Sequence, residues 1–551
     1  MKITRFLISV CLLCTYMVDI SAQDVTDYQT VPLPDKITMQ KGKPFVLDAT
    51  TTIFLATGDE ILAPEARFLQ EYVKQNTGIQ LQFGTSNKRN AITLRLDKSI
   101  PLTEGYHITI NQKGITISGA TSAGIFYGIQ MLRKALPCDT VYEHISLAPA
   151  EITDCPRFGY RGMHLDVCRH FFNIDFVKEY IDLLALHNMN TLHFHLTDDQ
   201  GWRMEIKKYP KLTTVGANRS GTVMGCNSDV DDHLPYGGYF TQEQLREIVS
   251  YAAERHITVI PEIEMPGHTL AILASYPEYG CTGGPYEVGH KWGIYSDILC
   301  AGKEETFTFL ENILDEVMDI FPSKYIHIGG DEAPKSKWEK CERCQQRIRE
   351  EGIKATDKQS AENLLQGYFT RRINAYLMQH GRKLIGWDEI AEFGIDTTAT
   401  VMSWRGAEPG IQAAKMGHDV IMAPTTYCYF DTYQTGDTYF EPKLIGGNIS
   451  VEKVYGFEPV SGAVDPKDAR HILGVQANLW TEYIPVKQLA EYQVLPRMAA
   501  LAEVQWLDPA KKDYQQFLLR LDKLTQLYRK YGLTYALHNW PELYNKERSV
   551  F

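Results

Sequence analysis

The chain has 551 residues, more than one hydrophobic core usually holds, so we expect a large domain with at least one smaller one. Hydrophobic residues make up 44% and charged residues 23% of the chain, which is typical of a globular protein and excludes a disordered one. The formal net charge of −12 argues against nucleic acid and anionic membranes as partners.

The N-terminus has the pattern of a secretory signal peptide, predicted over residues 1–22. Two basic residues precede an apolar run over residues 6–18, and Ser21 and Ala22 supply the small residues of a cleavage site. The run is too short to span a membrane. We therefore expect cleavage after Ala22 and an exported protein, periplasmic or extracellular, without a membrane span. A lipid anchor at Cys14 is the alternative, but the residues before Cys14 are not the small ones that lipidation requires.

Residues 23–155 are predicted to form a small α+β domain. Alternating apolar residues predict short strands at residues 79–83, 91–96, 106–110 and 115–118. Turn residues between the last two strands predict a hairpin. Helical periodicity is found at residues 63–76 and 122–135.

From residue 156 onward the pattern becomes a repeated alternation of strand and helix. Eight short β-rich segments are found at residues 162–167, 191–196, 257–263, 325–328, 383–386, 400–403, 419–422 and 472–476. Helical patterns lie between most of them, and Thr241 and Gln244 have the spacing of a capping box. Eight such units predict an α/β fold, a (β/α)8 TIM barrel. Helical patterns at 486–504 and 514–531 close this catalytic unit, which we assign to residues 156–551.

Each predicted barrel strand ends in charged, aromatic or hydrogen-bonding residues. A barrel places its active site at the carboxyl ends of its strands, so these residues are predicted to meet. They are Arg169, Asp198, Glu262, Glu264, His268, Asp331, Glu332, Trp387, Trp404, residues 427–431, Trp480 and Glu482. Core packing is the alternative for the three tryptophans, but tryptophan beside acids at a barrel mouth is typical of sugar binding.

Histidines and cysteines raise the question of a bound metal. His193 and His195 alternate with apolar residues, so we expect them inside the barrel and held by hydrogen bonds rather than by a metal. Cys341 and Cys344 have the spacing of a zinc knuckle, but no second Cys or His pair stands at a matching sequence distance. A local disulfide or two plain thiols is therefore preferred, and no metal is expected in the active site.

The stretch YIHIGGDEAP, residues 325–334, places two carboxylates side by side at the end of a strand. By alternation Asp331 should point into the barrel, whereas Glu332 needs the chain to turn, which the preceding glycine pair permits. An ordinary retaining glycosidase instead holds its acid and nucleophile about 5 to 5.5 Å apart across the scissile bond. Adjacent carboxylates suit a reaction in which the substrate supplies its own nucleophile.

These motifs closely resemble those of glycoside hydrolase family 20, the β-N-acetylhexosaminidases. The resemblance runs from the small N-terminal domain to the last barrel helix through VCRHFF, HFHLTDDQGW, PEIEMPGH, HIGGDE, GWDE and NLWTE, in this order. It implies that Glu332 is the general acid/base. It also implies that Asp331 orients the 2-acetamido group of the substrate and stabilises the charge on its nitrogen.

The resemblance also implies which residues bind the substrate. Tyr429 would hold the acetamido carbonyl oxygen. The pocket walls would be Trp387, Trp404 and Trp480. The ring hydroxyls would be bound by Arg169, Asp431 and Glu482. A polar relay behind Glu332 would consist of Asp198 and His268. Arg161 is a rival for the role of Arg169, and Tyr427 for that of Tyr429.

The implied activity is removal of terminal non-reducing β-linked N-acetylglucosamine or N-acetylgalactosamine from a glycan, by an exo-acting enzyme without a cofactor. Stereochemistry would be retained through an oxazolinium ion formed by the 2-acetamido group. A lacto-N-biosidase that releases a disaccharide is one alternative. A sugar-binding protein on an inactive scaffold is another, although Glu332 is present. A homodimer is possible.

Cys281 and Cys300 bracket a loop that follows His268. In an exported chain we predict that these two cysteines form a disulfide that pins the loop beside the pocket. In the chain-entropy model, closing a loop of about 20 residues contributes roughly 3 kcal/mol of stability.

Overall fold

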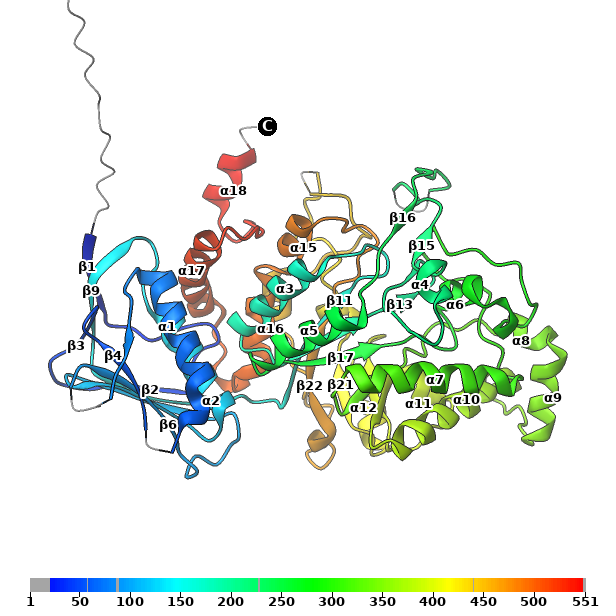
Figure 1. Ribbon diagram of the computed structural model, residues 1–551, viewed down its shortest axis with the longest axis horizontal. Coiled ribbons are helices and arrows are strands. Elements are labelled where there is room, and N and C mark those ends of the chain that lie inside the picture. The colour runs from blue at the N-terminus through cyan, green and yellow to red at the C-terminus, as the bar shows by residue number, and fades with distance from the viewer. Residues whose placement is uncertain (1–19, 57, 86–88, 226–227, 440, 549–551) are drawn as a thin grey trace, which may run out of the picture.

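The computed structural model describes residues 20–56, 58–85, 89–225, 228–439 and 441–548. Residues 1–19, which include Cys14 and most of the predicted signal peptide, lie outside these ranges. Figure 1 shows an N-terminal unit of sheets and helices beside a larger barrel. Within the described ranges, no helix combines the length and apolar character needed to cross a bilayer.

The N-terminal unit contains two sheets. The seven-stranded sheet has the order β2 (Lys36–Met39), β10 (Ala150–Asp154), β7 (Tyr106–Asn111), β8 (Gly114–Gly119), β6 (Ala91–Leu96), β4 (Thr52–Leu55) and β5 (Gln82–Phe83). The three-stranded sheet has the order β1 (Ile20–Val25), β9 (Val141–Leu147) and β3 (Phe45–Asp48). The predicted hairpin is the antiparallel pair β7 and β8, in which Asn111 faces Gly114. The strand predicted at 79–83 is shorter than expected and corresponds to β5.

Two helices, α1 (Ala63–Thr77) and α2 (Ser122–Ala135), lie between the seven-stranded sheet and the barrel (Figure 1). α1 ends at Gly78, whose φ of 79° is the left-handed conformation that glycine adopts readily. Contacts with the barrel are both polar and aromatic. Nη1 of Arg161 lies 2.7 Å from Oε2 of Glu104, and the rings of Phe126 and His256 are 5.3 Å apart. The N-terminal unit thus packs against the barrel through a layer of two helices.

The barrel is closed and consists of eight parallel strands. They are β11 (Tyr160–Asp166), β12 (Thr191–His195), β17 (Thr258–Glu262), β18 (Tyr325–His327), β19 (Lys383–Trp387), β20 (Thr400–Ser403), β21 (Val420–Met422) and β22 (Ile472–Ala477). Each corresponds to one of the eight predicted segments. The predicted (β/α)8 fold with a preceding α+β domain is confirmed.

The longer helices outside the barrel are α3 (Ile174–Leu186), α5 (Gln242–Ala253), α7 (Glu304–Ile320), α10 (Ala361–Gln379), α12 (Glu408–Lys415), α15 (Lys487–Val494), α16 (Arg497–Trp506) and α17 (Tyr514–Lys530). The capping box of Thr241 and Gln244 at the start of α5 is present. The helix predicted at 486–504 is two helices, α15 and α16. The chain breaks at Pro496, which has no backbone N–H to continue a helix.

The remaining elements are short. They are η1 (Glu60–Leu62), β13 (Thr197–Asp198), β14 (Gly201–Trp202), α4 (Lys211–Thr214), β15 (Asn218–Arg219), β16 (Tyr236–Gly237), α6 (Leu270–Ser275), η2 (Pro277–Tyr279), α8 (Ser336–Lys340), α9 (Glu342–Glu350), α11 (Glu389–Glu392), α13 (Thr425–Cys428), α14 (Val451–Tyr455), η3 (Ala469–His471), η4 (Pro509–Lys511) and α18 (Pro541–Arg548).

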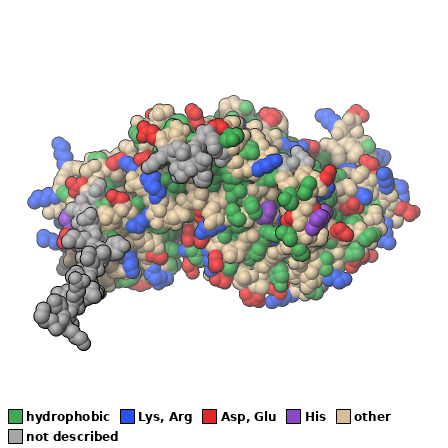
Figure 2. Space-filling model, turned by 90° about the horizontal axis from the view of Figure 1, so that it is seen from above, with side chains coloured by type: hydrophobic (Ala, Val, Ile, Leu, Met, Phe, Trp, Pro, Cys, Tyr) green, Lys and Arg blue, Asp and Glu red, His purple; other side chains and the backbone are tan. Residues whose placement is uncertain are grey.

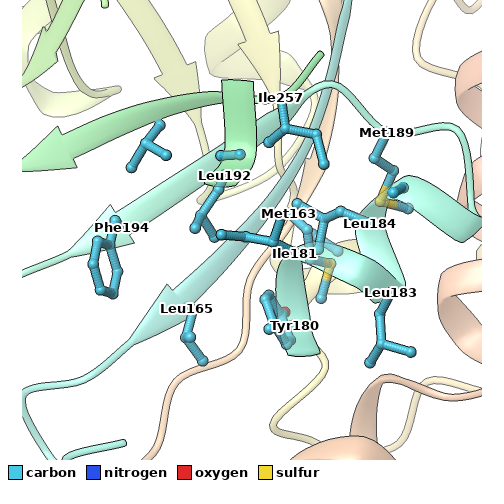
Figure 3. Close-up of a cluster of buried hydrophobic side chains, with 14 of the residues drawn as sticks. Met163, Leu165, Tyr180, Ile181, Leu183, Leu184, Met189, Leu192, Phe194 and Ile257 are labelled. Atoms are coloured by element: carbon cyan, nitrogen blue, oxygen red, sulfur yellow. The ribbon is translucent and has the colours of Figure 1, made fainter. Parts of the chain in front are cut away.

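Alternation along the strands separates an apolar layer from a polar interior. Figure 3 shows side chains of β11 and β12, such as Leu165 and Leu192, packed with Tyr180 and Leu184 of α3 outside the barrel. The opposite faces of the same strands carry histidines and acids into the interior. Because successive residues of a strand point to opposite faces, the apolar residues hold the helices and leave the polar ones for the site.

Acidic and basic side chains are interspersed over the face drawn in Figure 2. Sequence-independent binding of nucleic acid relies on lysine and arginine gathered along one surface. The mixture of charges on this face does not offer such a surface.

Candidate active site

A pocket of about 180 Å³ opens at the carboxyl ends of the barrel strands. Its lining residues are Arg169, Asp198, His268, Asp331, Glu332, Trp387, Trp404, Tyr429, Asp431, Ile445, Trp480 and Glu482. The structure therefore brings together all of the residues predicted to catalyse or bind, and adds Ile445. Every barrel strand or the loop after it contributes at least one of them, because parallel strands all end at the same rim.

Asp331 and Glu332 reach the pocket through a turn with unusual backbone angles. Gly329, Gly330 and Glu332 have φ angles of 64°, 92° and 46°. A Cβ added to Gly329 would meet Oε2 of Glu264 at 1.7 Å, so only glycine fits there. A left-handed glutamate costs on the order of 1 to 3 kcal/mol, and such strain is concentrated at functional sites. Gly329 and Gly330 thus form the predicted turn.

The turn gives the two carboxylates different surroundings. The side chain of Asp331 is 14% exposed, and its Oδ1 atom is buried without a hydrogen-bond partner among the described residues. The side chain of Glu332 is 34% exposed. Burial raises the pKa of Asp331 to about 6, an effect that the nearby His268 opposes and the carboxylates of Glu262 and Glu332 reinforce. The carboxylate of Asp331 is therefore the less exposed one and has an oxygen to which a ligand can donate. The carboxylate of Glu332 lies on the solvent side.

His268 stands between this carboxylate pair and a second pair behind it. Its Nε2 atom lies 3.5 Å from Oε2 of Glu332 and 3.7 Å from Oδ2 of Asp331. Its Nδ1 atom lies 3.0 Å from Oδ2 of Asp199 and 3.3 Å from Oδ1 of Asp198. Burial alone would lower the pKa of His268, but the carboxylates around it raise this pKa well above its ordinary value. The structure adds Asp199, the nearer of the two acids, to the predicted relay.

Arg169 is the arginine of the pocket. One of its guanidinium nitrogens lies 2.9 Å from Oδ2 of Asp198, and its Nε donates to Oε1 of Gln200 at 3.0 Å. The guanidinium also lies 5.0 Å from the ring of Trp480. The rival Arg161 lies at the junction with the N-terminal unit, where it binds Glu104. An arginine held in this way presents a fixed positive group to a ligand.

Aromatic side chains form the walls of the pocket. The rings of Trp387 and Trp480 are 5.9 Å apart, and those of Trp404 and Tyr429 are stacked at 6.4 Å. The indole N–H of Trp387 donates to Glu262, and that of Trp404 donates to Glu389. These bonds fix the orientation of both indoles, because a buried indole N–H needs a partner.

The two tyrosines that compete for one role have different surroundings. Tyr429 lines the pocket, whereas Tyr427 stacks on Phe457 with ring centroids 4.7 Å apart. Burial raises the pKa of Tyr429 well above its ordinary value, so its hydroxyl stays protonated and can donate a hydrogen bond.

Two further carboxyl groups, those of Asp431 and Glu482, lie in the pocket. Asp431 has a buried Oδ1 atom that makes no hydrogen bond within the described residues. Burial, and then the neighbouring Glu482, raise the pKa of Asp431 to about 8. Burial likewise raises the pKa of Glu482, against the effect of Arg169. Such unpaired acceptors are expected where a ligand brings the missing donors.

Beneath the pocket, Glu262 lies at the centre of a buried polar cluster. His195 contacts it directly, His193 Nε2 lies 3.1 Å away and His327 Nδ1 lies 2.9 Å away. His193 also accepts a hydrogen bond from Gln476 at 2.9 Å. The prediction that His193 and His195 face inward and are held by hydrogen bonds is confirmed. The role of Glu262, which the sequence left open, is to anchor this layer and Trp387.

The predicted disulfide between Cys281 and Cys300 is wrong for this structure, because both are free thiols. The sequence treated the two cysteines as an isolated pair. In the fold, Sγ of Cys300 is also 3.7 Å from Sγ of Cys341 and 3.6 Å from Sγ of Cys344. Cys300 therefore has Cys341 and Cys344 as neighbours as well as Cys281.

Several other residues of the site were missed. Ile445 follows a barrel strand by more than twenty positions, in a loop with no regular periodicity. Glu264 was singled out but given no role. It is buried, and its Oε2 atom has no hydrogen-bond partner in the part of the chain that the structure describes. Burial and then Asp331 raise its pKa well above its ordinary value. Asp199 could have been found from the doubled aspartate in HFHLTDDQGW.

Carboxylates and tryptophan walls gathered at the strand ends of a (β/α)8 barrel define a glycoside hydrolase. The comparisons with known proteins agree. The pattern described as "Glycosyl hydrolase family 20, catalytic domain" matches residues 158–509, and that of "Glycosyl hydrolase family 20, domain 2" matches residues 27–155. The chain belongs to glycosyl hydrolase family 20.

Relatives of known name lie in the same family. The β-hexosaminidase of Porphyromonas gingivalis is 42% identical over 516 residues, which cover 92% of this chain and 64% of that relative. The chain thus spans somewhat less than two thirds of its length. The β-hexosaminidase of Akkermansia muciniphila is 33% identical, covering 79% of this chain and 86% of the relative.

Solved structures show the same fold. An exo β-N-acetylglucosaminidase of family 20 from Vibrio harveyi, in complex with N-acetylglucosamine, superposes with a TM-score of 0.81 and is 30% identical. This match covers 94% of the present chain and 80% of the other. The β-N-acetylhexosaminidase of Bacteroides fragilis has a TM-score of 0.77 and 30% identity, with 92% and 96% covered.

Proposed function

We propose that the protein is an exo-β-N-acetylhexosaminidase. It removes terminal non-reducing β-linked N-acetylglucosamine or N-acetylgalactosamine from glycans and retains the anomeric configuration. The observation that carries the proposal is the pair Asp331 and Glu332, adjacent in the chain and both approached by Nε2 of His268. The side chain of Asp331 is 14% exposed and has an unpaired oxygen among the described residues, whereas that of Glu332 is 34% exposed, and two different roles on one substrate require such different surroundings.

In the first step, Glu332 donates its proton to the glycosidic oxygen while the bond from this oxygen to the anomeric carbon breaks. The carbonyl oxygen of the substrate's 2-acetamido group attacks the same carbon, and an oxazolinium ion forms. Its positive charge lies on the former amide, where the carboxylate of Asp331 accepts the N–H and stabilises the charge. The hydroxyl of Tyr429 donates to the acetamido oxygen and orients it for attack.

In the second step, Glu332 is ionised and takes a proton from water as the water attacks the anomeric carbon. The acetamido oxygen leaves, so two inversions give net retention. His268 stays close to Glu332 throughout, and its own contacts to Asp198 and Asp199 hold it there. No protein carboxylate forms a bond to the sugar.

The dimensions of the pocket support an exo-acting enzyme. Its volume of about 180 Å³ is below the roughly 300 to 1,000 Å³ usual for larger ligands. The indoles of Trp387, Trp404 and Trp480 offer flat apolar surfaces for the sugar face and the acetamido methyl group. Arg169, Asp431 and Glu482 provide charged partners for ring hydroxyls. This favours release of a single sugar residue over release of a disaccharide.

The test compares 4-nitrophenyl β-glycosides. The N-acetylglucosaminide and N-acetylgalactosaminide should be cleaved, whereas the matched glucoside and galactoside, which lack the 2-acetamido group, should not. A 4-nitrophenyl disaccharide glycoside serves as the control for a lacto-N-biosidase. Equal cleavage of the glucoside would mean that the protein supplies its own nucleophile. Binding of the substrates without turnover would instead indicate a sugar-binding protein.

We also propose that the chain is exported and cleaved after Ala22. The signal-like pattern of the N-terminus supports this. N-terminal sequencing of secreted or periplasmic protein is the measurement, and a lipid-modified Cys14 would contradict it. Light scattering of the purified protein checks the predicted homodimer.

A further inference from the structure

Four cysteines from three separate segments meet at one point beside the barrel. Cys281 follows η2, Cys300 precedes α7, Cys341 lies between α8 and α9, and Cys344 lies in the first turn of α9. The Sγ atoms are separated by 3.9 Å between Cys281 and Cys344, 3.7 Å between Cys300 and Cys341, and 3.6 Å between Cys300 and Cys344. All four sulfurs lie within 4.8 Å of one another.

These distances match metal coordination rather than disulfide bonding. A disulfide brings two sulfurs to about 2.05 Å. A tetrahedral zinc ion with Zn–S bonds of about 2.3 Å separates its sulfur ligands by about 3.8 Å, from the geometry of the tetrahedron. The three printed separations fall close to this value. With three separations near this value and all four sulfurs within 4.8 Å of one another, the cluster has the size of a site for one zinc ion.

Local backbone structure places the sulfurs in two pairs. Gly280 and Leu299 form an antiparallel bridge, and the amide of Cys300 donates to the carbonyl of Tyr279 at 2.8 Å, so the segments that carry Cys281 and Cys300 are held together. The other pair has the C-x2-C spacing at the start of a helix, which presents both sulfurs to the same side. Cys281 and Cys300 are thus the second pair of cysteines, which sequence spacing did not reveal and which a β-bridge brings together.

The surroundings are those of a closed structural site. Cys300 and Cys344 are fully buried and Cys341 is 9% exposed. The backbone N–H of Gly302 donates to the sulfur of Cys300, a contact of the kind that orients metal ligands and stabilises thiolates. A Cβ on Gly302 would meet the backbone carbon of Arg343 at 2.2 Å. The two cysteine-bearing segments therefore approach as closely as their backbones allow.

We propose that Cys281, Cys300, Cys341 and Cys344 bind one zinc ion in a structural ZnCys4 site. Four thiolate ligands favour zinc among the divalent ions with no redox role, and four protein ligands are typical of a structural site, since a catalytic zinc keeps one position for water. This site is independent of the proposed glycosidase activity, since none of its ligands lines the pocket.

The position of the zinc site gives it a bracing role. The amide of Leu299, next to Cys300, donates to the carbonyl of Pro266, two residues before His268. The indole N–H of Trp338 in α8 donates to the carbonyl of Leu299 at 2.9 Å. The ion thus joins the loop after β17, which carries His268, to the segment after β18, which carries Glu332.

The experiment is metal analysis of the full-length protein purified without a metal-affinity resin. About one zinc per chain is expected, retained during dialysis against a chelator because three of the four ligands are buried. Cys344→Ser and Cys300→Ser should lose the zinc and lower Tm. Cys138→Ser is the matched control, because Cys138 is a buried cysteine between α2 and β9, two elements that lie far from α8 and α9 in Figure 1. It should retain the zinc.

Two measurements on the unmutated protein keep the test decisive if the variants do not fold. Titration with a mercurial should release the zinc to a chromogenic chelator as four thiols react. Growth with cobalt should give a protein with the thiolate-to-cobalt absorption of a tetrahedral CoS4 centre. The proposal is overturned by zinc-free protein whose four cysteines map as two disulfides, by iron in place of zinc, or by zinc that remains in Cys300→Ser.

Discussion

Nε2 of His268 lies 3.5 Å from Oε2 of Glu332, the carboxyl group on the open side of the pocket. Because buried carboxylates raise the pKa of His268, the imidazole carries a positive charge at neutral pH and is a hydrogen-bond donor on both nitrogens. Its pKa therefore lies above the acid range of the pH profile. The acid side of the pH profile must come from a different group.

We predict that this group is Asp331. Burial raises its pKa to about 6, and only the ionised form stabilises a positive oxazolinium. The required carboxylate is present above about pH 6 and is lost as the pH falls through this value, so kcat/KM should decline on the acid side. A pH profile of aryl N-acetylglucosaminide hydrolysis measures it, with recovery at pH 7 as the control for unfolding. The residual rate of Asp331→Asn should lack this limb, and a limb unchanged in that variant would contradict the assignment.

The roles of the two carboxylates can be separated by the leaving group. Glu332→Gln should reduce the rate on natural glycosides by about 10² to 10⁴, but much less on an aryl glycoside whose leaving group departs without a proton. Asp331→Asn should be slow with every leaving group, because the charge that it stabilises forms on the substrate itself. Single-turnover aryl release over a series of leaving-group pKa values measures both. A steep dependence is expected for Glu332→Gln and a shallow one for Asp331→Asn. Reversed slopes would exchange the two roles.

Tyr429 and Tyr427 form a matched pair for testing the acetamido contact. Tyr429→Phe removes a hydroxyl that lines the pocket and should lower kcat/KM by roughly 10². Tyr427→Phe removes the same group from a ring that stacks on Phe457 outside the pocket, and should leave kcat/KM nearly unchanged. Steady-state kinetics on one aryl substrate decides between them. A larger loss of kcat/KM in Tyr427→Phe than in Tyr429→Phe would show that Tyr427 makes the acetamido contact.

The glycine turn before Asp331 predicts a stability effect with its own control. Gly329 and Gly352 have nearly equal φ angles, 64° and 63°. Alanine at Gly352 meets nothing within 4 Å and should cost only the left-handed strain of about 1 to 2 kcal/mol. Gly329→Ala adds the clash with Glu264, so it should lower the free energy of unfolding further and abolish activity. Urea unfolding of both variants provides the comparison, and equal losses would show that the clash relaxes.

The sequence by itself determined the barrel and the membership of its pocket. Short β-rich segments separated by helical patterns identified all eight strands, because each strand of such a barrel is followed by a helix. Closure of parallel strands then obliges their ends to meet. Residues as distant as Arg169 and Glu482 could therefore be assigned to one site without knowledge of any contact.

Tertiary structure decided what depends on the packing of separate segments. It placed Arg169 in the pocket and Arg161 at the domain junction, although both lie on or just after the same strand. It brought Cys281 and Cys300 to Cys341 and Cys344 by a β-bridge and a helix start. Spacing along the chain reports contacts only within one regular element. Where loops of irregular backbone approach one another, the three-dimensional path of the chain sets the distances between side chains.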